Sequence, residues 1–334
     1  MDAASTASAR LRELLIAGGV VAARSGPVAP AHFDAVRASL MVARGDVTSD
    51  RFTFRNPSRS ANPPGWARWS VAAAVGYPVG EGSGDGLRVA AYARTDTYSS
   101  LRDLLSGGVA ILREEGIKAA YSIDSNGAFD KAFARRNRLG WVGRNTLVMI
   151  PGWGPAVVIG TILTGTPIEI AIGREAGRWP CGSCARCQMA CPTGALTGGG
   201  EIVPKLCVAW VGQKESLSAG ERRALGTRVY GCDECIVACP VGSRRRRPLP
   251  TLPPSQITEA SPEEVIDRFG HWYIPRRDPR FVYRNALVAL ANRGRYDRNA
   301  RQAVVRFLLD EDSRMRREAL LAWLALRHHA EAAS

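Results

Sequence analysis

Half of the cysteines of this 334-residue chain lie in one short stretch, Cys181-Gly-Ser-Cys-Ala-Arg-Cys-Gln-Met-Ala-Cys-Pro192. A second stretch, Cys232-Asp-Glu-Cys-Ile-Val-Ala-Cys-Pro240, contains three more, and Cys207 lies between the two. No cysteine occurs outside residues 181–239. This concentration indicates that the eight thiols act together in one part of the fold.

Three kinds of site use cysteines at such short spacing. Disulfide frameworks are typical of small secreted proteins, and nothing in this sequence marks secretion. Zinc sites use paired C-x2-C units, but they require neither a third cysteine at the same spacing nor a fourth followed by proline. The run C-x2-C-x2-C-x3-C-P is the spacing of bacterial ferredoxins with two clusters, in which the fourth cysteine binds the neighbouring cluster. The spacing therefore favours iron–sulfur clusters.

Two 4Fe–4S clusters with four thiolate ligands each would use every cysteine of the chain. The first cluster would take Cys181, Cys184, Cys187 and the distant Cys239. The second cluster would take Cys191, Cys207, Cys232 and Cys235. Such a pair conducts single electrons, so chemistry on an organic substrate would need a further centre beside it.

Upstream of the cysteines, strand and helix patterns alternate, which predicts a mixed α/β domain over residues 1–165. Strands are expected over residues 70–77, 87–92, 118–123, 146–150 and 156–163, and helices over 7–42 (one or two), 97–115 and 127–136. Residues 166–250 are rich in loops and cysteines, which predicts a ferredoxin-like domain built around the two clusters. The tract Arg244–Arg247, followed by four prolines within residues 248–254, is typical of a linker.

Beyond the linker, the sequence predicts an all-α domain over residues 255–334. Amphipathic helices are expected over residues 263–269, 280–292, 299–309 and 314–328. The segments Arg284-Asn-Ala-Leu-Val-Ala-Leu-Ala and Arg317-Glu-Ala-Leu-Leu-Ala-Trp-Leu-Ala are alike and lie 33 residues apart. Their similarity suggests a pair of HEAT-like repeats, and an ordinary helical cap is the alternative.

The chain is strongly basic, with a net charge of +14, and half of this surplus falls in residues 241–334. Four arginines (Arg276, Arg277, Arg280 and Arg284) follow His271-Trp272-Tyr273. Basic and aromatic side chains together suit RNA, whose phosphates and unstacked bases they can bind, and a solvated helix face is the alternative. No segment has the roughly 18 uninterrupted apolar residues that a membrane span needs. The apolar stretch 14–23 is interpreted as part of a first helix, so a cytoplasmic protein is expected.

At its cysteine motifs the chain resembles the epoxyqueuosine reductase family, whose members use cobalamin and two 4Fe–4S clusters. Three further segments are similar to that family: Ile123-Asp124-Ser125, Leu139-Gly-Trp-Val-Gly-Arg-Asn-Thr-Leu147 and Tyr92-Ala-Arg-Thr-Asp-Thr-Tyr98. The resemblance covers residues from about 70 to 240. It implies a cobalamin-binding N-terminal domain and C-terminal helices that help to hold tRNA.

The activity implied by the resemblance is the reduction of epoxyqueuosine to queuosine at the tRNA wobble position. Electrons would pass from an external donor of the flavodoxin or ferredoxin type through the two clusters to cobalamin. The implied protein is a monomer that binds the anticodon stem-loop and no membrane.

The resemblance also implies site residues. Asp124 corresponds to the family's proton donor, whereas the sequence alone favours an N-cap of the helix expected over 127–136. The expected cobalamin contacts are Asn145, Val148, Ile159, Asp233 and Glu234.

The chain departs from the family pattern at Ser99, at Val241-Gly242 and over residues 202–226. These departures leave a paralogue with another substrate as an alternative. Two other functions remain open: a reductive-dehalogenase-like corrinoid reductase of a small molecule, and a non-catalytic protein that transfers electrons or reactivates a corrinoid protein.

Overall fold

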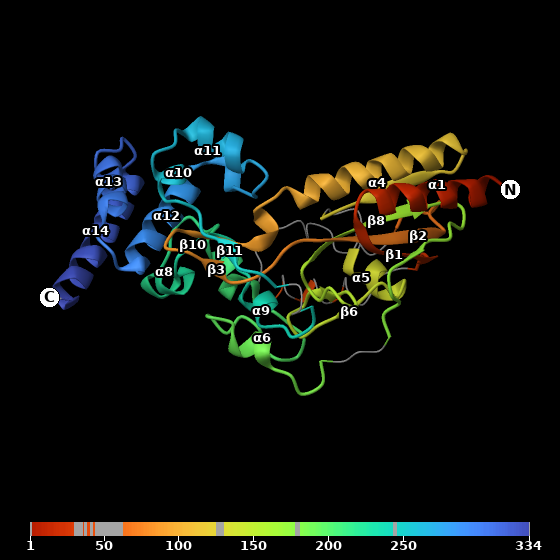
Figure 1. The fold of residues 1–334 in the computed structure, drawn as a ribbon, viewed down its shortest axis with the longest axis horizontal. Coiled ribbons are helices and arrows are strands. Elements are labelled where there is room, and N and C mark those ends of the chain that lie inside the picture. Colours follow the sequence, from red (N-terminus) through yellow and green to blue (C-terminus); the bar gives the residue numbers. More distant parts are fainter. Residues whose placement is uncertain are drawn as a thin grey trace.

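The computed structural model describes residues 2–29, 36, 39–40, 43, 63–124, 130–177, 181–242 and 246–333. The molecule is elongated (Figure 1). A sheet with its covering helices forms the N-terminal end, and a group of helices forms the C-terminal end. The cysteine-rich segment, which contains α6 (Arg186–Met189) and α9 (Glu234–Val237), lies between them.

The N-terminal part is built on a five-stranded sheet with the order β5-β8-β2-β1-β9. Its strands are β1 (Val20–Pro27), β2 (Trp69–Gly76), β5 (Ala119–Ser122), β8 (Val157–Thr164) and β9 (Ala171–Ile172). All neighbouring strands are antiparallel. The central strand β2 is buried from Ser70 to Ala74, as expected of a strand covered on both faces.

Helices cover both faces of this sheet because successive side chains of a strand point to opposite sides. Val71 and Ala73 pack in one cluster with α1 (Ala3–Ala17) and α4 (Thr97–Glu114). Ala72 and Ala74 pack in another with α5 (Asp130–Arg136). Figure 1 shows α1 and α4 together on one side of the sheet and α5 on the other.

Most of the elements expected upstream of the cysteines are confirmed: β2, α4, β5, α5 and β8 lie within a few residues of their predicted ranges. Of the one or two helices expected over residues 7–42, α1 is confirmed, residues 20–27 form a strand instead, and residues 36 and 39–40 are helical, while the rest of residues 30–42 lies outside the described part. Residues Val20–Pro27 form a strand because the β-branched Val20-Val21 opens a segment that pairs with β2 along its length. The strand expected over 87–92 is only β4 (Arg88–Val89), and a short 3-10 helix, η1 (Ala91–Ala93), follows it.

Two short parallel pairings join the N-terminal part to the cysteine-rich segment. Strand β4 pairs with β10 (Arg228–Tyr230), and β3 (Gly82–Ser83) pairs with β11 (Leu249–Pro250). The linker interpretation is therefore wrong for Leu249–Pro250, which form a strand. The domain boundaries at 165 and 250 stay predictions, and β9 shows that the first sheet continues to Ile172.

The cysteine-rich segment and the loop facing it consist of short elements, as the loop-rich sequence predicts. They are β6 (Trp141–Val142), β7 (Val148–Met149), η2 (Pro204–Leu206), α7 (Val208–Val211) and α8 (Ala219–Leu225), besides α6 and α9. Helices of four residues do not stabilise themselves, so their positions depend on packing and on ligands.

The C-terminal part contains α10 (Ser255–Thr258), α11 (Pro262–Phe269), η4 (Pro275–Arg277), α12 (Arg280–Arg293), α13 (Arg298–Leu308) and α14 (Ser313–Ala333). The four longer helices confirm the predicted ones. Helix α12 is buried without interruption from Phe281 to Ala291, which makes it the central helix of this part. The two similar segments lie in α12 and α14, and the HEAT-like interpretation stays a prediction. Among the described residues no helix combines the length and apolar character needed to cross a membrane.

Candidate iron–sulfur and active site

The eight cysteines are all free thiols, and the charges they would carry as thiolates connect them in two groups. In the first group, burial raises the pKa of Cys239, and the neighbouring Cys181 and Cys187 raise it further. Burial likewise raises the pKa of Cys187, with smaller contributions from Cys181 and Cys184. These four cysteines are the ones that the spacing assigns to the first cluster.

The second group contains the other four cysteines. Burial raises the pKa of Cys232 to about 11, and Cys207 adds to this shift. The pKa of Cys207 is raised by burial and by Cys191. Cys235 has its pKa raised by burial, then by Cys232 and Cys207, and also by Cys187 of the first group. Cys187 and Cys235 are thus the point where the two groups meet, on α6 and α9, which pack together.

This donor set suits iron–sulfur clusters. Thiolates are the ligands of 4Fe–4S clusters, and each binds a different iron of the cube. Across the described ranges, no three His, Cys, Asp or Glu side chains converge closely enough to hold a single metal ion. Because burial raises most of the thiol pKa values, iron binding has to release protons from these cysteines. The assignment of each cysteine to a cluster stays a prediction.

Asp124, the expected proton donor, directly follows β5 and Ile123 at the edge of the sheet. It is exposed, and its backbone has φ 43, in the left-handed region. Its backbone N–H donates to Oδ2 of Asp130 over 3.2 Å. Helix α5 is described from Asp130 onward, and residues 125–129 lie outside the described part, so the N-cap interpretation of Asp124 stays a prediction.

Asp130 is a functional candidate that the sequence analysis missed. Its Oδ1 accepts a hydrogen bond of 2.8 Å from the hydroxyl of Thr161 on β8. Burial raises the pKa of Asp130 to about 7, although the hydrogen bonds from Thr161 and Asp124 oppose this shift. In the sequence, only its position as an acidic residue in the first turn of a helix stands out, and that is a common structural preference.

Two partly buried tyrosines connect Asp124 with the second cysteine motif. Burial raises the pKa of Tyr98, on α4, and the charges of Asp124 and Asp130 raise it further. Burial raises the pKa of Tyr230 to about 12, and Asp124 contributes there too. Tyr230 lies two residues before Cys232, so it connects the surroundings of Asp124 with the second cysteine motif.

The two acidic residues expected to contact cobalamin lie beside the second cysteine group but have different surroundings. Asp233 is buried; its Oδ2 accepts from the backbone N–H of Ala91, and its Oδ1 has no partner among the described residues. Burial raises the pKa of Asp233 to about 6. Burial opposes ionisation of Glu234, but hydrogen bonds and charges from Arg228 and Arg88 lower its pKa overall.

The other three expected contacts lie on the α5 side of the sheet. Val148 and Ile159 pack in the same apolar cluster as α5. Asn145 is buried, and its Oδ1 accepts from the backbone N–H of Leu147 over 3.2 Å. Ile159 shares a face of β8 with Thr161, the partner of Asp130, because alternate residues of a strand point the same way. All five contacts stay predictions.

The raised pKa of Asp130 predicts a pH-dependent stability. An acid with a folded-state pKa of about 7 and an ordinary value of 3.8 binds its proton more tightly in the folded chain. Between these values the folded state holds more protons, so its stability falls as pH rises and levels off above 7. We expect the denaturation midpoint of the anaerobic protein to fall between pH 5.5 and 7.5, and Asp130→Asn to flatten this fall. An unchanged pH profile in the variant would contradict the assignment.

Comparison with known proteins agrees with this geometry. Residues 180–242 match the family of 4Fe-4S double cluster binding domains. Over 246 residues the chain is 31% identical to the epoxyqueuosine reductase of Listeria monocytogenes, an overlap of 66% of this chain and 63% of that protein. It is 30% identical over 191 residues to the Bacillus subtilis epoxyqueuosine reductase, and the overlap covers 54% of this chain and 49% of that protein.

The fold is similar to solved epoxyqueuosine reductase structures. One contains a tRNA-Tyr epoxyqueuosine-modified stem loop; it aligns with a TM-score of 0.82 at 23% identity, over 96% of this chain and 90% of that one. Another, from Bacillus subtilis, has its aspartate catalytic loop swung out of the active site and aligns with a TM-score of 0.80 at 24% identity, over 96% and 90% of the two chains.

A mixed α/β fold joined to a double-cluster segment defines an iron–sulfur protein with two neighbouring cluster sites. Within that class, the chain is similar in sequence to curated epoxyqueuosine reductases and shares the fold of solved ones. The match spans between about half and two thirds of the length of these curated relatives.

Proposed function

We propose that this protein reduces epoxyqueuosine in tRNA to queuosine. The observation that carries the proposal is the position of Asp124, which lies within electrostatic reach of Tyr98 and Tyr230 and is so connected with the second cysteine motif. A proton donor next to an electron path is the arrangement that this reduction requires. The curated relatives and the solved structure with a modified stem loop bear the name of this activity.

The reaction breaks the two C–O bonds of the epoxide and releases its oxygen as water, which consumes two electrons and two protons. Cobalamin and the two clusters, when bound, would supply the two electrons. Of the expected cobalamin contacts, Asp233 fits the cofactor best because its buried Oδ1 is free to meet a donor. Glu234 fits less well because Arg88 and Arg228 already hold its carboxylate.

Asp124 would protonate the departing oxygen. A carboxyl group donates a proton effectively only when its pKa approaches the working pH. Because Asp124 is exposed in the chain alone, substrate and cofactor would have to cover it and so remove its carboxyl from water. Its backbone hydrogen bond to Asp130 keeps the residue at the end of β5 while this happens.

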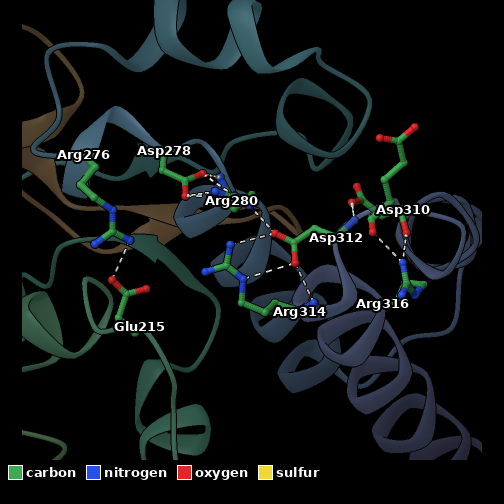
Figure 2. Close-up of polar contacts among 9 residues, drawn as sticks. Glu215, Arg276, Asp278, Arg280, Asp310, Asp312, Arg314 and Arg316 are labelled. Carbon is green, nitrogen blue, oxygen red and sulfur yellow. Dashed lines mark hydrogen bonds and ion pairs between the residues drawn. The ribbon is translucent and has the colours of Figure 1, made fainter.

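The tRNA would bind along the C-terminal helices, but not through all the residues that the sequence suggested. Arg284 and Trp272 are buried, so the expectation that they face RNA is wrong. Figure 2 shows that Arg276 points to Glu215 and that Asp312 lies between Arg280 and Arg314. These arginines are neutralised by acidic neighbours within the chain.

Arginines without such neighbours are better candidates for phosphate contacts. Arg298 and Arg301 on α13 are exposed, and the described residues provide neither with a partner. The logarithm of the binding constant for an anticodon stem-loop should fall linearly with the logarithm of salt concentration. Replacing both arginines by alanine should lower this slope by about one for each lost contact. Arg314→Ala, which removes a paired guanidinium, serves as the control and should lower the slope less.

The proposed activity is tested with anaerobically reconstituted protein, cobalamin, a strong reductant and tRNA that carries epoxyqueuosine. After digestion of the tRNA, mass spectrometry of the nucleosides should show the loss of one oxygen only when cobalamin is present. Full cluster content and bound cobalamin without any conversion would contradict the proposed substrate. That result would favour a relative with the same redox centre and another substrate.

A further inference from the structure

One face of α12 lies against the backbone segments that carry Cys207 and Cys232. Arg284 and Asn285, at the start of this helix, are 4% and 3% exposed. Both side chains donate to backbone carbonyls outside α12. These contacts join the central C-terminal helix to the second cysteine group.

Arg284 binds the end of α7, the short helix that follows Cys207. Its Nη2 donates to the carbonyl of Gly212, the C-cap of α7, over 2.7 Å. Its Nη1 donates to the carbonyls of Lys214 and Glu215 in the next turn of the chain. The planar fork of arginine allows one side chain to bind several carbonyls at fixed angles. Burial lowers the pKa of Arg284 to about 10, which leaves the side chain charged at neutral pH.

Asn285 connects two segments that are distant in the sequence. Its Nδ2 donates to the carbonyl of Gly212 and to that of Val229, each over 2.9 Å. Its Oδ1 accepts from Nε and Nη2 of Arg284 over 3.1 and 3.0 Å. Gly212 follows α7 and Cys207, whereas Val229 lies on β10, three residues before Cys232. One amide therefore sets the distance between the two segments.

Apolar packing supports the same contact. Val288, one turn along α12, packs with Val208 and Val211 of α7, and Cys232 lies against this cluster. An ion pair of 2.6 Å between Arg276 and Glu215, drawn in Figure 2, adds a second connection beside Arg284. Because α7 has only four residues, its orientation has to be imposed by such neighbours.

We propose that Arg284 and Asn285 are positioning residues for the second 4Fe–4S cluster, which hold the segments of Cys207 and Cys232 at the separation that the cube needs. The C-terminal helices then form part of the cluster site in addition to any contact with tRNA. The inference rests on the proposed assignment of Cys207 to the second cluster.

The test is Asn285→Leu, which keeps the size of the side chain and removes both carbonyl contacts. After anaerobic reconstitution, iron should fall from about eight atoms per chain to about four. The electron paramagnetic resonance spectrum of the reduced variant should equal that of Cys207→Ala. If Cys207→Ala itself retains both clusters, the ligand assignment is wrong and the inference falls with it, while the tRNA assay still tests the activity separately.

Asn292→Leu is the matched control. Asn292 also lies on α12 and donates to two carbonyls, those of Arg222 and Gly226 over 2.7 and 2.9 Å, but both belong to α8 and its C-cap. This variant should retain both clusters. Full iron content in Asn285→Leu, or equal loss of iron in the two variants, would overturn the inference.

Arg284→Lys provides a second measurement if Asn285→Leu does not fold. Lysine keeps the charge but loses the planar fork, so both clusters should assemble. A chelator should then remove iron from the second cluster several-fold faster than from the first, as followed by the two spectra. The same ratio of the two rates as in the native protein, measured alongside, would contradict a positioning role.

Discussion

Asp124→Asn should lower the turnover of epoxyqueuosine tRNA by about two to four orders of magnitude, the usual contribution of a positioned general acid. Asparagine has nearly the same shape as aspartate but has no acidic proton to give to the departing oxygen. The clusters and cobalamin should bind as in the native protein, because Asp124 lies at the end of β5, outside both cysteine groups. Single-turnover conversion, iron content and bound cobalamin are the three measurements.

A matched control for this variant is Asp103→Asn. Asp103 is an exposed acid on α4, in the same part of the fold. It should retain full turnover. If Asp124→Asn retains turnover as well, or if it loses cobalamin together with turnover, then Asp124 is not the proton donor.

Cys239→Ala should abolish turnover and remove the first cluster while it leaves the second. In the sequence Cys239 belongs to the same motif as Cys232 and Cys235. In the fold, however, its thiol lies near those of Cys181 and Cys187. A site with only three thiolates should no longer hold the first cluster, and its loss breaks the electron path.

Spectroscopy can identify which cluster is lost. The reduced spectrum of Cys239→Ala should equal that of Cys181→Ala and differ from that of Cys235→Ala. If the spectrum of Cys239→Ala instead equals that of Cys235→Ala, then Cys239 is a ligand of the second cluster. The three variants share the same chemical change, so differences among them report the location of the ligand.

The double-cluster segment could be predicted because cluster chemistry restricts the spacing of its ligands. The strands β2 and β8 and the helix α4 could be predicted because their apolar residues recur with a clear period. The strand β1 was assigned to a helix because the apolar stretch 14–23 was interpreted as part of the first helix. Pairing with β2 along its length makes residues 20–27 a strand instead.

The surroundings of Asp124 could not be predicted, because they come from elements far apart in the chain. Tyr98, Thr161 and Tyr230 lie on α4, β8 and β10, and no local pattern connects them. Arg284 was misassigned for the same reason. An arginine at the start of an amphipathic helix is usually solvated, and only the packing of α12 against residues 212–215 buries it.

The pairing of β4 with β10, and of β3 with β11, has a consequence for how the chain folds during synthesis. Residues 82–89 leave the ribosome long before residues 228–250, which supply their partner strands. Contacts so distant in sequence form slowly, because a long loop has to close first. Cluster insertion into the second motif is therefore expected to be a late event that follows the pairing of residues 82–89 with residues 228–250. Before that pairing, both cysteine motifs would be open to the assembly machinery of the cell.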